Sequence, residues 1–221
     1  MGSFINDITA FMPQILNGLK NTVMLMAIIS VTGFLGGIAV FYMKINGGRI
    51  SRRMTGSFIS FFIGTPLLVH LFLMYYGLPQ LGIRMSPLAI SVIGFTLNVS
   101  AYNAHYLMTA FNGLDAAEIE AARAQGFTTS EIFFFIILPQ VLRFSVPSLT
   151  NQIIQNLKDT SVAFLIQYQD FFVAVQELAA TNFEFFRAYT MAGFVYLAMV
   201  SVIVLGARRL ERHIILPGFG S

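Results

Sequence analysis

The sequence predicts an all-α polytopic membrane protein, and three observations support this fold class. Hydrophobic residues make up 56% of the 221 residues, and only 10% are charged, whereas about a quarter of the residues of a soluble domain are charged. The mean hydropathy is +0.73. The charged residues are also far apart, which leaves apolar stretches of about 20 residues, the length that a helix needs to cross a bilayer. A disordered chain, a collagen-like fibre and a basic nucleic-acid-binding module are therefore excluded.

Five stretches are apolar enough to be transmembrane helices, all within one transmembrane domain that covers residues 1–221. Four of them contain a long stretch whose only possible charged side chain, where there is one, is a single histidine, namely residues 21–43, 54–83, 85–114 and 188–207. The fifth is interrupted by Lys158 and Asp159, and charged side chains at this depth are costly enough to suggest a function. The predicted spans are about residues 17–43, 55–77, 87–112, 144–168 and 188–208.

Breaker residues and basic residues indicate the edges and the orientation of these spans. Pro87 is expected to start the third span and Pro147 to mark the entry to the fourth. Lys and Arg cluster after the first span, in the long connection between the third and fourth, and after the fifth, where Arg208, Arg209 and Arg212 follow. The positive-inside rule therefore predicts an extracytoplasmic amino terminus, a cytoplasmic carboxyl terminus and a cytoplasmic connection. No cleavable signal is expected, because the first residues carry Asp7 and no basic region.

The long connection, residues 113–143, begins with a predicted short helix. Asp115 and Glu118 have the spacing of a capping box, and most residues between 116 and 124 are strong helix formers. Gly126 suits the left-handed position that ends a helix. The first helix of the connection is therefore expected to end at this glycine.

A second short helix is predicted directly after the glycine. Thr128 and Glu131 repeat the capping-box spacing. The helix is expected to stop near Leu138, because Pro139 cannot continue it. The connection thus reads as two short helices that meet in an elbow.

The first helix of the elbow has one flank without bulky side chains. Ala121, Ala122 and Gly126 would let a partner approach the backbone, while Glu120 and Arg123 form a charged rim at i, i+3 spacing. This pattern predicts a knob that docks into a partner protein. The alternative is a well-capped hairpin with no partner.

The elbow also carries a family motif. Glu120-Ala121-Ala122 is followed after three residues by Gly126, and after nine more by Ile136-Ile137-Leu138-Pro139. This spacing resembles the EAA motif of the membrane subunits of ABC importers, in particular those for polar amino acids. Three other segments, 64–69, 75–79 and 158–161, resemble the same family, and the likeness extends from about residue 15 to Arg212.

The resemblance implies a type I ABC importer permease fold in a bacterial inner membrane, with the elbow as a cytoplasmic pair of coupling helices. It also implies four kinds of partner: two ATP-binding subunits that use ATP and Mg, an identical or homologous permease subunit, an extracytoplasmic solute-binding protein, and membrane lipid. No phosphate-binding loop occurs in the chain, so no cofactor is expected here. The residues expected to couple to the ATPase are Asp115, Glu120, Ala121, Ala122, Arg123, Gly126, Leu138 and Pro139.

Polar side chains inside the predicted spans are candidates for a substrate path. Thr65-Pro66 should interrupt the second span and free a backbone carbonyl. A helical stripe on the third span would face the protein interior. Lys158 and Asp159 are adjacent, so they should not face each other; a structural ion pair is the alternative to a gating role. The candidates are Thr65, Pro66, Asn98, Tyr102, His105, Met108, Lys158 and Asp159.

Two of these candidates depart from the family. Relatives usually have a Glu and an Arg at the positions of His105 and Met108, so a charge-reading site for the amino acid head group cannot be carried over. His105 is then a substrate contact or an ordinary packing residue, and His70 is treated in the same way. Residues 75–83 resemble permeases for cystine or related sulphur amino acids, while opine, arginine, histidine and glutamine stay open as substrates.

Two other function classes compete with an importer permease. A passive channel or facilitator for small polar solutes would use similar polar stripes, but it has no need of a docking elbow. A membrane enzyme would need a catalytic constellation, and the sequence contains no metal-spaced histidine cluster and no nucleophile elbow. No cysteine is present either, so no disulfide and no thiolate metal site are expected. The chain is thus expected to have no catalytic residue and no metal.

Overall fold

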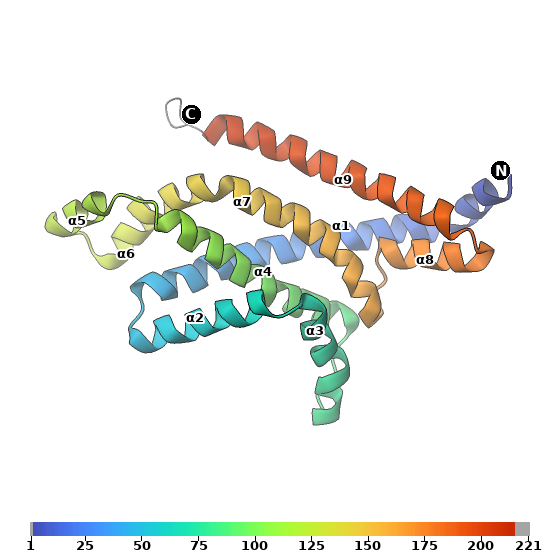
Figure 1. Ribbon diagram of the computed structural model, residues 1–221, viewed down its shortest axis with the longest axis horizontal. Helices are drawn as coiled ribbons and strands as arrows, with labels where there is room; N and C mark the ends of the chain where they lie inside the picture. Colours follow the sequence, from blue (N-terminus) through green and yellow to red (C-terminus); the bar gives the residue numbers. More distant parts are fainter. Residues whose placement is uncertain (1, 215–221) are drawn as a thin grey trace.

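The computed structural model of the chain describes residues 2–214, with side chains for residues 4–181 and 183–209. All regular secondary structure within this part of the chain is helical. Most of the helices run along one long axis, with the amino terminus near one end and the elbow at the other (Figure 1). The side chain of Arg212 and residues 215–221 lie outside the described part.

The first helix is much longer than the predicted span. α1 runs from Gly2 to Asn46 and contains 45 residues, which corresponds to roughly 67 Å at 1.5 Å per residue. The hydrocarbon core of a bilayer is only about 30 Å thick. Only part of α1 can therefore lie in the hydrocarbon at one time, unless the helix is strongly tilted.

The second predicted span is broken in two. α2 covers Arg49–Gly64, and a second helical segment covers Leu67–Leu81 at an angle of 101° to it. This second segment consists of α3 (Leu67–Phe72), a π-helical turn η1 (Leu73–Gly77) and a 3₁₀ turn η2 (Leu78–Leu81). The predicted interruption at Thr65-Pro66 is thus present within residues 55–77, as a sharp bend between two helical segments.

The third predicted span is present as a single helix. α4 covers Pro87–Phe111, and the Ser86 side chain caps it by accepting a hydrogen bond from the Ala89 backbone N–H at 3.2 Å. Pro87 occupies the first turn, where its missing N–H has no intrahelical partner to lose. The predicted start at this proline agrees with the structure.

The fourth span begins well before its predicted entry. The helix α6 (Thr129–Glu131) continues through a π-helical turn η3 (Ile132–Ile137) into α7 (Leu138–Asp159) and a 3₁₀ turn η4 (Thr160–Ile166). Two expectations are therefore wrong: the helix does not stop before Pro139, and Pro147 lies inside α7. The wide π-turn resets the hydrogen-bond register, so that Pro139 falls in the first turn of α7, where no N–H is required.

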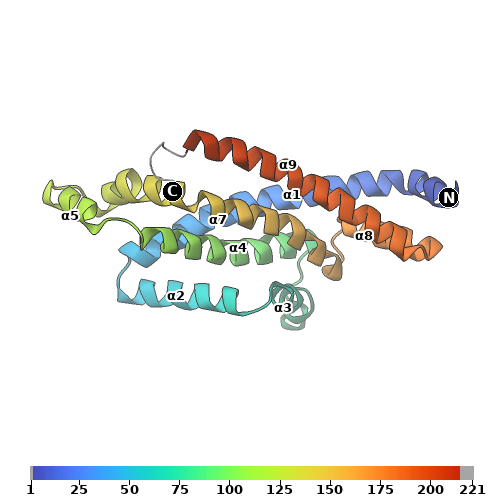
Figure 2. The ribbon, with the colours of Figure 1, turned by 45° about the horizontal axis from the view of Figure 1, so that its top comes forward.

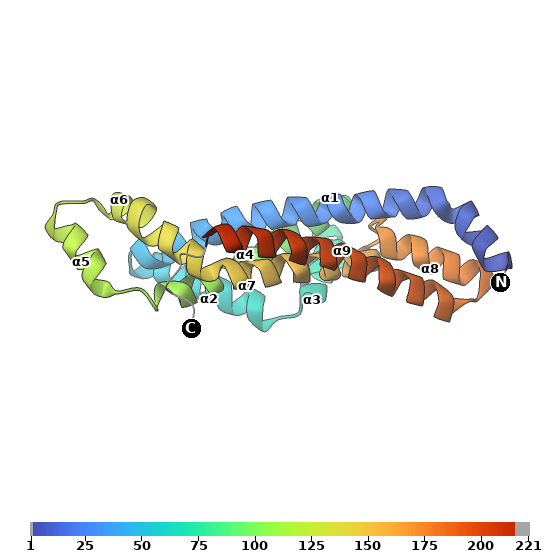
Figure 3. The same cartoon turned by 90° about the horizontal axis from the view of Figure 1, so that it is seen from above.

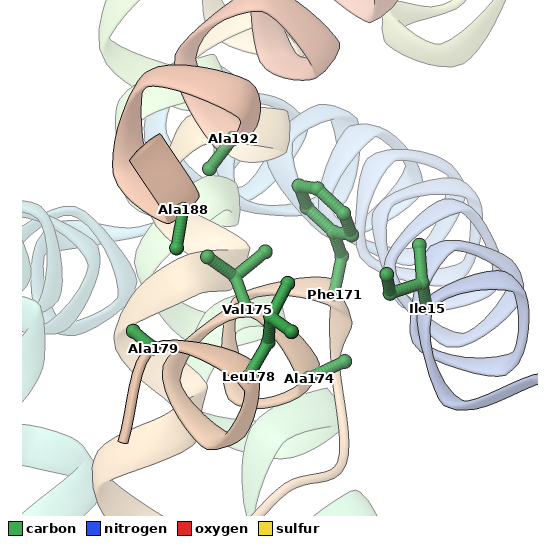
Figure 4. Packing of buried hydrophobic residues seen from close by; sticks show 8 residues of the cluster. All are labelled: Ile15, Phe171, Ala174, Val175, Leu178, Ala179, Ala188 and Ala192. Atoms are coloured by element: carbon green, nitrogen blue, oxygen red, sulfur yellow. The ribbon is translucent and has the colours of Figure 1, made fainter. Parts of the chain in front are cut away.

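One helix lies outside the five predicted spans and the predicted elbow. α8 covers Phe171–Asn182 and precedes α9, Phe185–Ile214. α8 packs between the amino-terminal half of α1 and the start of α9, and Figure 4 shows Phe171, Val175 and Leu178 of α8 directed toward Ile15 and Ala188. These contacts give α8 an apolar environment within the protein.

Among the residues that the structure describes, three helical stretches are long and apolar enough to cross a membrane, or four if the bent pair counts as one span. The three are Phe4–Asn46, Thr129–Ile166 and Phe185–Arg209. The predicted number of five is not confirmed. α4, which has 25 residues, lies alongside the others between α1, α2 and α7 (Figures 2 and 3).

Candidate functional site: a two-helix elbow and a cavity at a helix break

The elbow consists of residues 113–137 and lies at one tip of the molecule (Figure 1). Its first helix, α5, covers Ala116–Ala124, and Asp115 caps it by accepting a hydrogen bond from the Ala117 backbone N–H at 2.9 Å. The predicted capping box is not formed, because the Glu118 carboxylate accepts a hydrogen bond from the Gln140 side chain at 2.7 Å instead. This bond ties α5 to the first turn of α7.

The turn after α5 has the geometry expected of a glycine. Gly126 has a φ of +89°, a conformation that side-chain-bearing residues rarely adopt. The Phe127 N–H donates to the Ala122 carbonyl at 3.2 Å, and the Gly126 N–H donates to the Arg123 carbonyl at 3.0 Å. These two bonds form a Schellman motif, which satisfies carbonyls at the end of α5.

The second helix of the elbow starts with a complete capping box. The Glu131 carboxylate accepts a hydrogen bond from the Thr128 backbone N–H at 2.8 Å, and the Thr128 hydroxyl accepts one from the Glu131 N–H at 3.3 Å. The Thr128 hydroxyl also donates to the carboxylate at 2.7 Å. These bonds favour the ionised form, so the pKa of Glu131 lies below its usual value. The structure agrees with the predicted capping at this position.

The flank of the elbow differs from the prediction in one residue. Glu120, Ala121, Arg123 and Gly126 are exposed. Ala122 is 5% exposed and belongs to an apolar cluster with Ile132, Phe133 and Val141. It therefore faces the protein rather than a partner.

The last two residues of the motif belong to the helix that leaves the elbow. Leu138 is half-buried and Pro139 is exposed at the start of α7. Motion of the elbow would be transmitted to α7 through this continuous backbone.

A cavity of about 640 Å³ lies where α2 breaks, between the end of α2, the middle of α4 and the outgoing half of α7. We call it the break cavity. Gly64, Thr65 and Pro66 form one edge of it. The polar side chains that line it are Thr65, Asn98, Tyr102, Tyr106, Asn151, Gln152, Gln155 and Asp159.

Pro66 and Asn98 together explain the break. Proline has no N–H, so the carbonyl of Phe62, four residues earlier, loses its helical partner. The Asn98 side chain of α4 supplies the missing donor and bonds this carbonyl at 3.1 Å. Thr65 has extended backbone angles, φ −124° and ψ 142°, as expected for a residue before proline. A buried amide thus stabilises the broken end of α2.

The Thr65 side chain links the cavity edge to a buried histidine. Its hydroxyl hydrogen-bonds the Phe61 carbonyl and His70 Nε2, both at 2.5 Å. A hydroxyl has one hydrogen, which goes to the carbonyl, so the histidine must donate through Nε2. His70 is 5% exposed, and Phe61 and Phe62 pack against its ring. It holds Thr65 in place and does not line the break cavity.

The other predicted path residues are divided among different surroundings. Asp159 lines the break cavity and accepts a hydrogen bond from the Gln155 side chain at 2.7 Å. Lys158 lines a separate cavity of about 480 Å³ together with Tyr189 and Tyr196. No salt bridge joins Lys158 to Asp159 in the described part of the chain, consistent with their adjacent positions on a helix.

His105 and Met108 do not line the break cavity. His105 is exposed, and Met108 packs against the apolar cluster under the elbow. The stripe that faces the cavity continues from Asn98 and Tyr102 to Tyr106 instead, at a regular spacing of four residues. That spacing was available in the sequence and could have identified Tyr106.

The amides of α7 were missed altogether. Asn151, Gln152 and Gln155 lower the hydropathy of the predicted fourth span, and three amides at 151, 152 and 155 are a signal of a polar helix face. The described residues contain no group of three or more His, Cys, Asp or Glu side chains placed to hold a metal ion.

Comparison with known proteins identifies the family. Residues 32–216 match the model of the binding-protein-dependent transport system inner membrane component. The chain belongs to this family. It is a transport component rather than an enzyme, as its relatives are named permease proteins.

Several relatives are similar over almost their whole length. The chain is 32% identical to the probable amino-acid permease protein YxeN of Bacillus subtilis (strain 168), over 95% of each protein. It is 30% identical to the L-cystine transport system permease protein TcyB of the same organism, over 93% of this chain and 90% of that protein. The family is therefore that of amino-acid ABC transporter permeases.

Solved structures support the fold. A crystal structure of an amino acid ABC transporter with histidines has a TM-score of 0.84 and 27% identity, and covers 93% of this chain and 96% of that chain. An inward-facing structure of the MetNI methionine ABC transporter has a TM-score of 0.77 at 17% identity, and covers 94% of this chain and 99% of that chain. The fold is thus that of ABC importer permeases.

Proposed function

We propose that this chain is the permease subunit of an ATP-driven importer for a polar amino acid. Two copies, or this chain and a homologous one, would enclose the path in the inner membrane, with the amino terminus outside and the carboxyl terminus in the cytoplasm. The observation that carries the proposal is the elbow. It lies at the tip of the molecule (Figure 1), and Glu120, Ala121, Arg123 and Gly126 are all exposed on it.

The elbow has the properties of a docking element for an ATPase subunit. Two small exposed residues, Ala121 and Gly126, allow close approach to its backbone. Its helices are capped at Asp115 and Thr128, and the Glu118–Gln140 bond fixes it to α7. A rigid element that continues into a long helix can transmit motion. ATP and Mg would be bound by the partner ATPase.

The break cavity has the chemistry to bind an amino acid. Asp159 supplies a carboxylate that suits an ammonium group, and the amides and tyrosines supply neutral donors for a carboxylate. In the described part of the chain, no Lys or Arg lines this cavity. We therefore expect Asp159 to bind the α-ammonium group. The likeness to the cystine permease TcyB and the sequence of residues 75–83 favour cystine or a related sulphur amino acid.

Transport would follow from a two-state equilibrium of the membrane dimer. A solute-binding protein would deliver the substrate from outside, and closure of two ATPase subunits on ATP would favour the outward-open state. The substrate can shift this equilibrium only if the two states bind it with different affinity. A passive channel is the competing proposal, and it predicts transport without any ATPase.

The experiment compares Gly126→Asp with Gly48→Asp. The first places a charge on the docking surface and a side chain at a φ of +89°. The second places the same charge at the α1–α2 turn at the same end of the molecule, where Gly48 has ordinary angles, open space around it and the N-cap position of α2. Aspartate is a favourable N-cap.

We expect Gly126→Asp to insert normally but to lose both ATPase co-purification and ATP-dependent uptake, while Gly48→Asp keeps both. ATP-dependent uptake that is undiminished in Gly126→Asp would rule out docking through the elbow. Uptake by the wild-type permease without any ATPase subunit would support the channel instead.

A further inference from the structure

The segment after the helix break, residues 67–81, protrudes from the side of the bundle. We call it the bent arm. It lies at 101° to α2, and in Figure 1 it leaves the aligned helices at nearly a right angle. A segment bent this far is not a straight continuation of α2, so its place in the transporter needs a separate explanation.

One face of the bent arm packs on its own chain. Leu71 is fully buried, and Met74 and Tyr75 pack against the same apolar cluster. The arm lies so close to α4 that a Cβ atom on Gly94 would come within 2.7 Å of the Leu71 side chain and 3.5 Å of the Met74 sulfur. The direction of the bend is therefore set by close packing against α4.

The opposite face of the arm is apolar and has no partner in the described chain. Val69, Leu73 and Tyr76 are 45%, 58% and 54% exposed. They follow one another along the arm at intervals of four and three residues, so the exposed apolar surface runs along its length. The tip continues this apolar surface with Leu81, which is 76% exposed.

The composition of the arm argues against a position in the lipid–water interface. Residues 67–81 contain no Asp, Glu, Lys or Arg, whereas helices that lie in the interface carry a strongly polar face rich in Lys or Arg. A helix that is apolar on all sides is normally buried in protein or lipid. Lipid covers such a helix as well as protein does, so the choice between the two rests on the cavity at the base of the arm.

The break cavity identifies which protein. Asn151 and Gln155 line it and are exposed on α7, and amides that face lipid are costly. The cavity therefore needs a wall that this chain does not supply. The bent arm starts at Pro66 and Leu67, which lie at the edge of the same cavity. The open side of the cavity and the exposed arm therefore lie next to each other.

We propose that the Val69–Leu73–Tyr76 face of the bent arm docks onto the same face of a second copy of this chain, across a two-fold axis, and helps to close one end of the path between the two copies. This inference rests on the proposed function, since it assumes a permease dimer. In a two-fold dimer both arms would make the same contact. A change of angle at Thr65-Pro66 would then alter access to the cavity.

The test uses the absence of cysteine from the chain. Leu73→Cys and Tyr76→Cys each give a permease with a single thiol, and Met74→Cys is a matched control on the face that packs against α4. Membranes that contain the assembled transporter are treated with a mild oxidant. We expect the permease–permease disulfide at position 73 or 76 to exceed that at position 74 by at least about fivefold, because disulfides tolerate little separation.

Leu73→Lys supplies a second measurement that does not depend on disulfide geometry. If the arm docks on a second copy, uptake should fall at least about tenfold with normal membrane insertion, because a buried unpaired charge is costly. If the arm lies at the lipid–water interface, a lysine there is tolerated. Equal crosslinking at the three positions together with normal uptake by Leu73→Lys would overturn the proposal.

The outcome is separable from that of the importer proposal. Loss of uptake in Gly126→Asp, with no crosslink at 73 or 76 and normal uptake by Leu73→Lys, would leave the importer intact and reject the docking arm. Undiminished ATP-dependent uptake in Gly126→Asp would reject docking through the elbow, while the crosslinks would still report whether two copies meet at the arm.

Discussion

The elbow and the break cavity are built in different ways. The bonds that shape each elbow helix and its turn join residues at most five positions apart, such as Phe127 to Ala122 and Thr128 to Glu131. The break cavity depends on a bond between residues 36 positions apart, Asn98 and Phe62, and on three helices that meet. A change in the elbow should therefore affect docking alone, whereas a change in the cavity can affect both transport and folding.

The largest effect is expected at Asp159. Asp159→Asn keeps the shape of the side chain and an oxygen to accept the bond from Gln155, but it removes the charge proposed to bind the substrate ammonium. A hydrogen bond to a charged group contributes about 1.5–3 kcal/mol, so the KM for uptake should rise roughly 10- to 100-fold. Uptake kinetics in vesicles measure this.

Co-purification of the ATPase is the control for Asp159→Asn, and it should be unchanged because the elbow is intact. Asp159→Asn would then raise the KM but keep ATPase co-purification, whereas Gly126→Asp would lose ATPase co-purification. This pair of results would show that the cavity and the elbow have different functions. An unchanged KM in Asp159→Asn would contradict the assignment of this carboxylate to the substrate.

A smaller effect, on stability, is expected at Asn98. Asn98→Leu leaves the Phe62 carbonyl without its donor at the break. An unsatisfied buried carbonyl costs about 1–3 kcal/mol, so the midpoint of thermal unfolding should fall. Asn151→Leu is the matched control, because Asn151 is exposed in the same cavity. Equal midpoints for both variants would show that Asn98 does not support the break.

The elbow depends on contacts between residues that are close in sequence, and the cavity on contacts between distant helices. This difference also explains which features the sequence could predict. The turn at Gly126 and the Thr128–Glu131 capping box follow from residues next to each other, and the structure shows both. The missing capping box at Glu118 has a tertiary cause, because Gln140 competes for the carboxylate. Local rules could not include this partner.

For the cavity, the sequence predicted that Thr65-Pro66 would interrupt a helix but not the direction of the bend. The angle depends on how Leu71 and Met74 fit against Gly94 of another helix. The predicted stripe took His105 after Tyr102, at a spacing of three residues, whereas the residue of α4 that lines the cavity is Tyr106, at a spacing of four. The path of α7 through Pro139 required the π-turn before it, which no residue pattern indicated.

The smallest expected effect is a pH dependence confined to the elbow. The pKa of Glu131 is lowered by its hydrogen bonds from the Thr128 side chain and backbone. A carboxylate with a lowered pKa in the folded state stabilises that state at pH values above its unfolded pKa, about 4.3. This contribution is lost as the pH falls through the folded pKa. Fraying of the second elbow helix should therefore increase only under acid conditions.

Glu131→Gln is the matched control for this effect. Glutamine can accept the same bonds at Thr128 but does not titrate. Amide hydrogen exchange near residues 128–132, corrected for intrinsic rates, should show stronger protection in the wild type than in Glu131→Gln near neutral pH. The difference should disappear as the pH falls below the lowered pKa of Glu131 in the folded state. A difference that persists in acid would mean that the carboxylate is not the stabilising group.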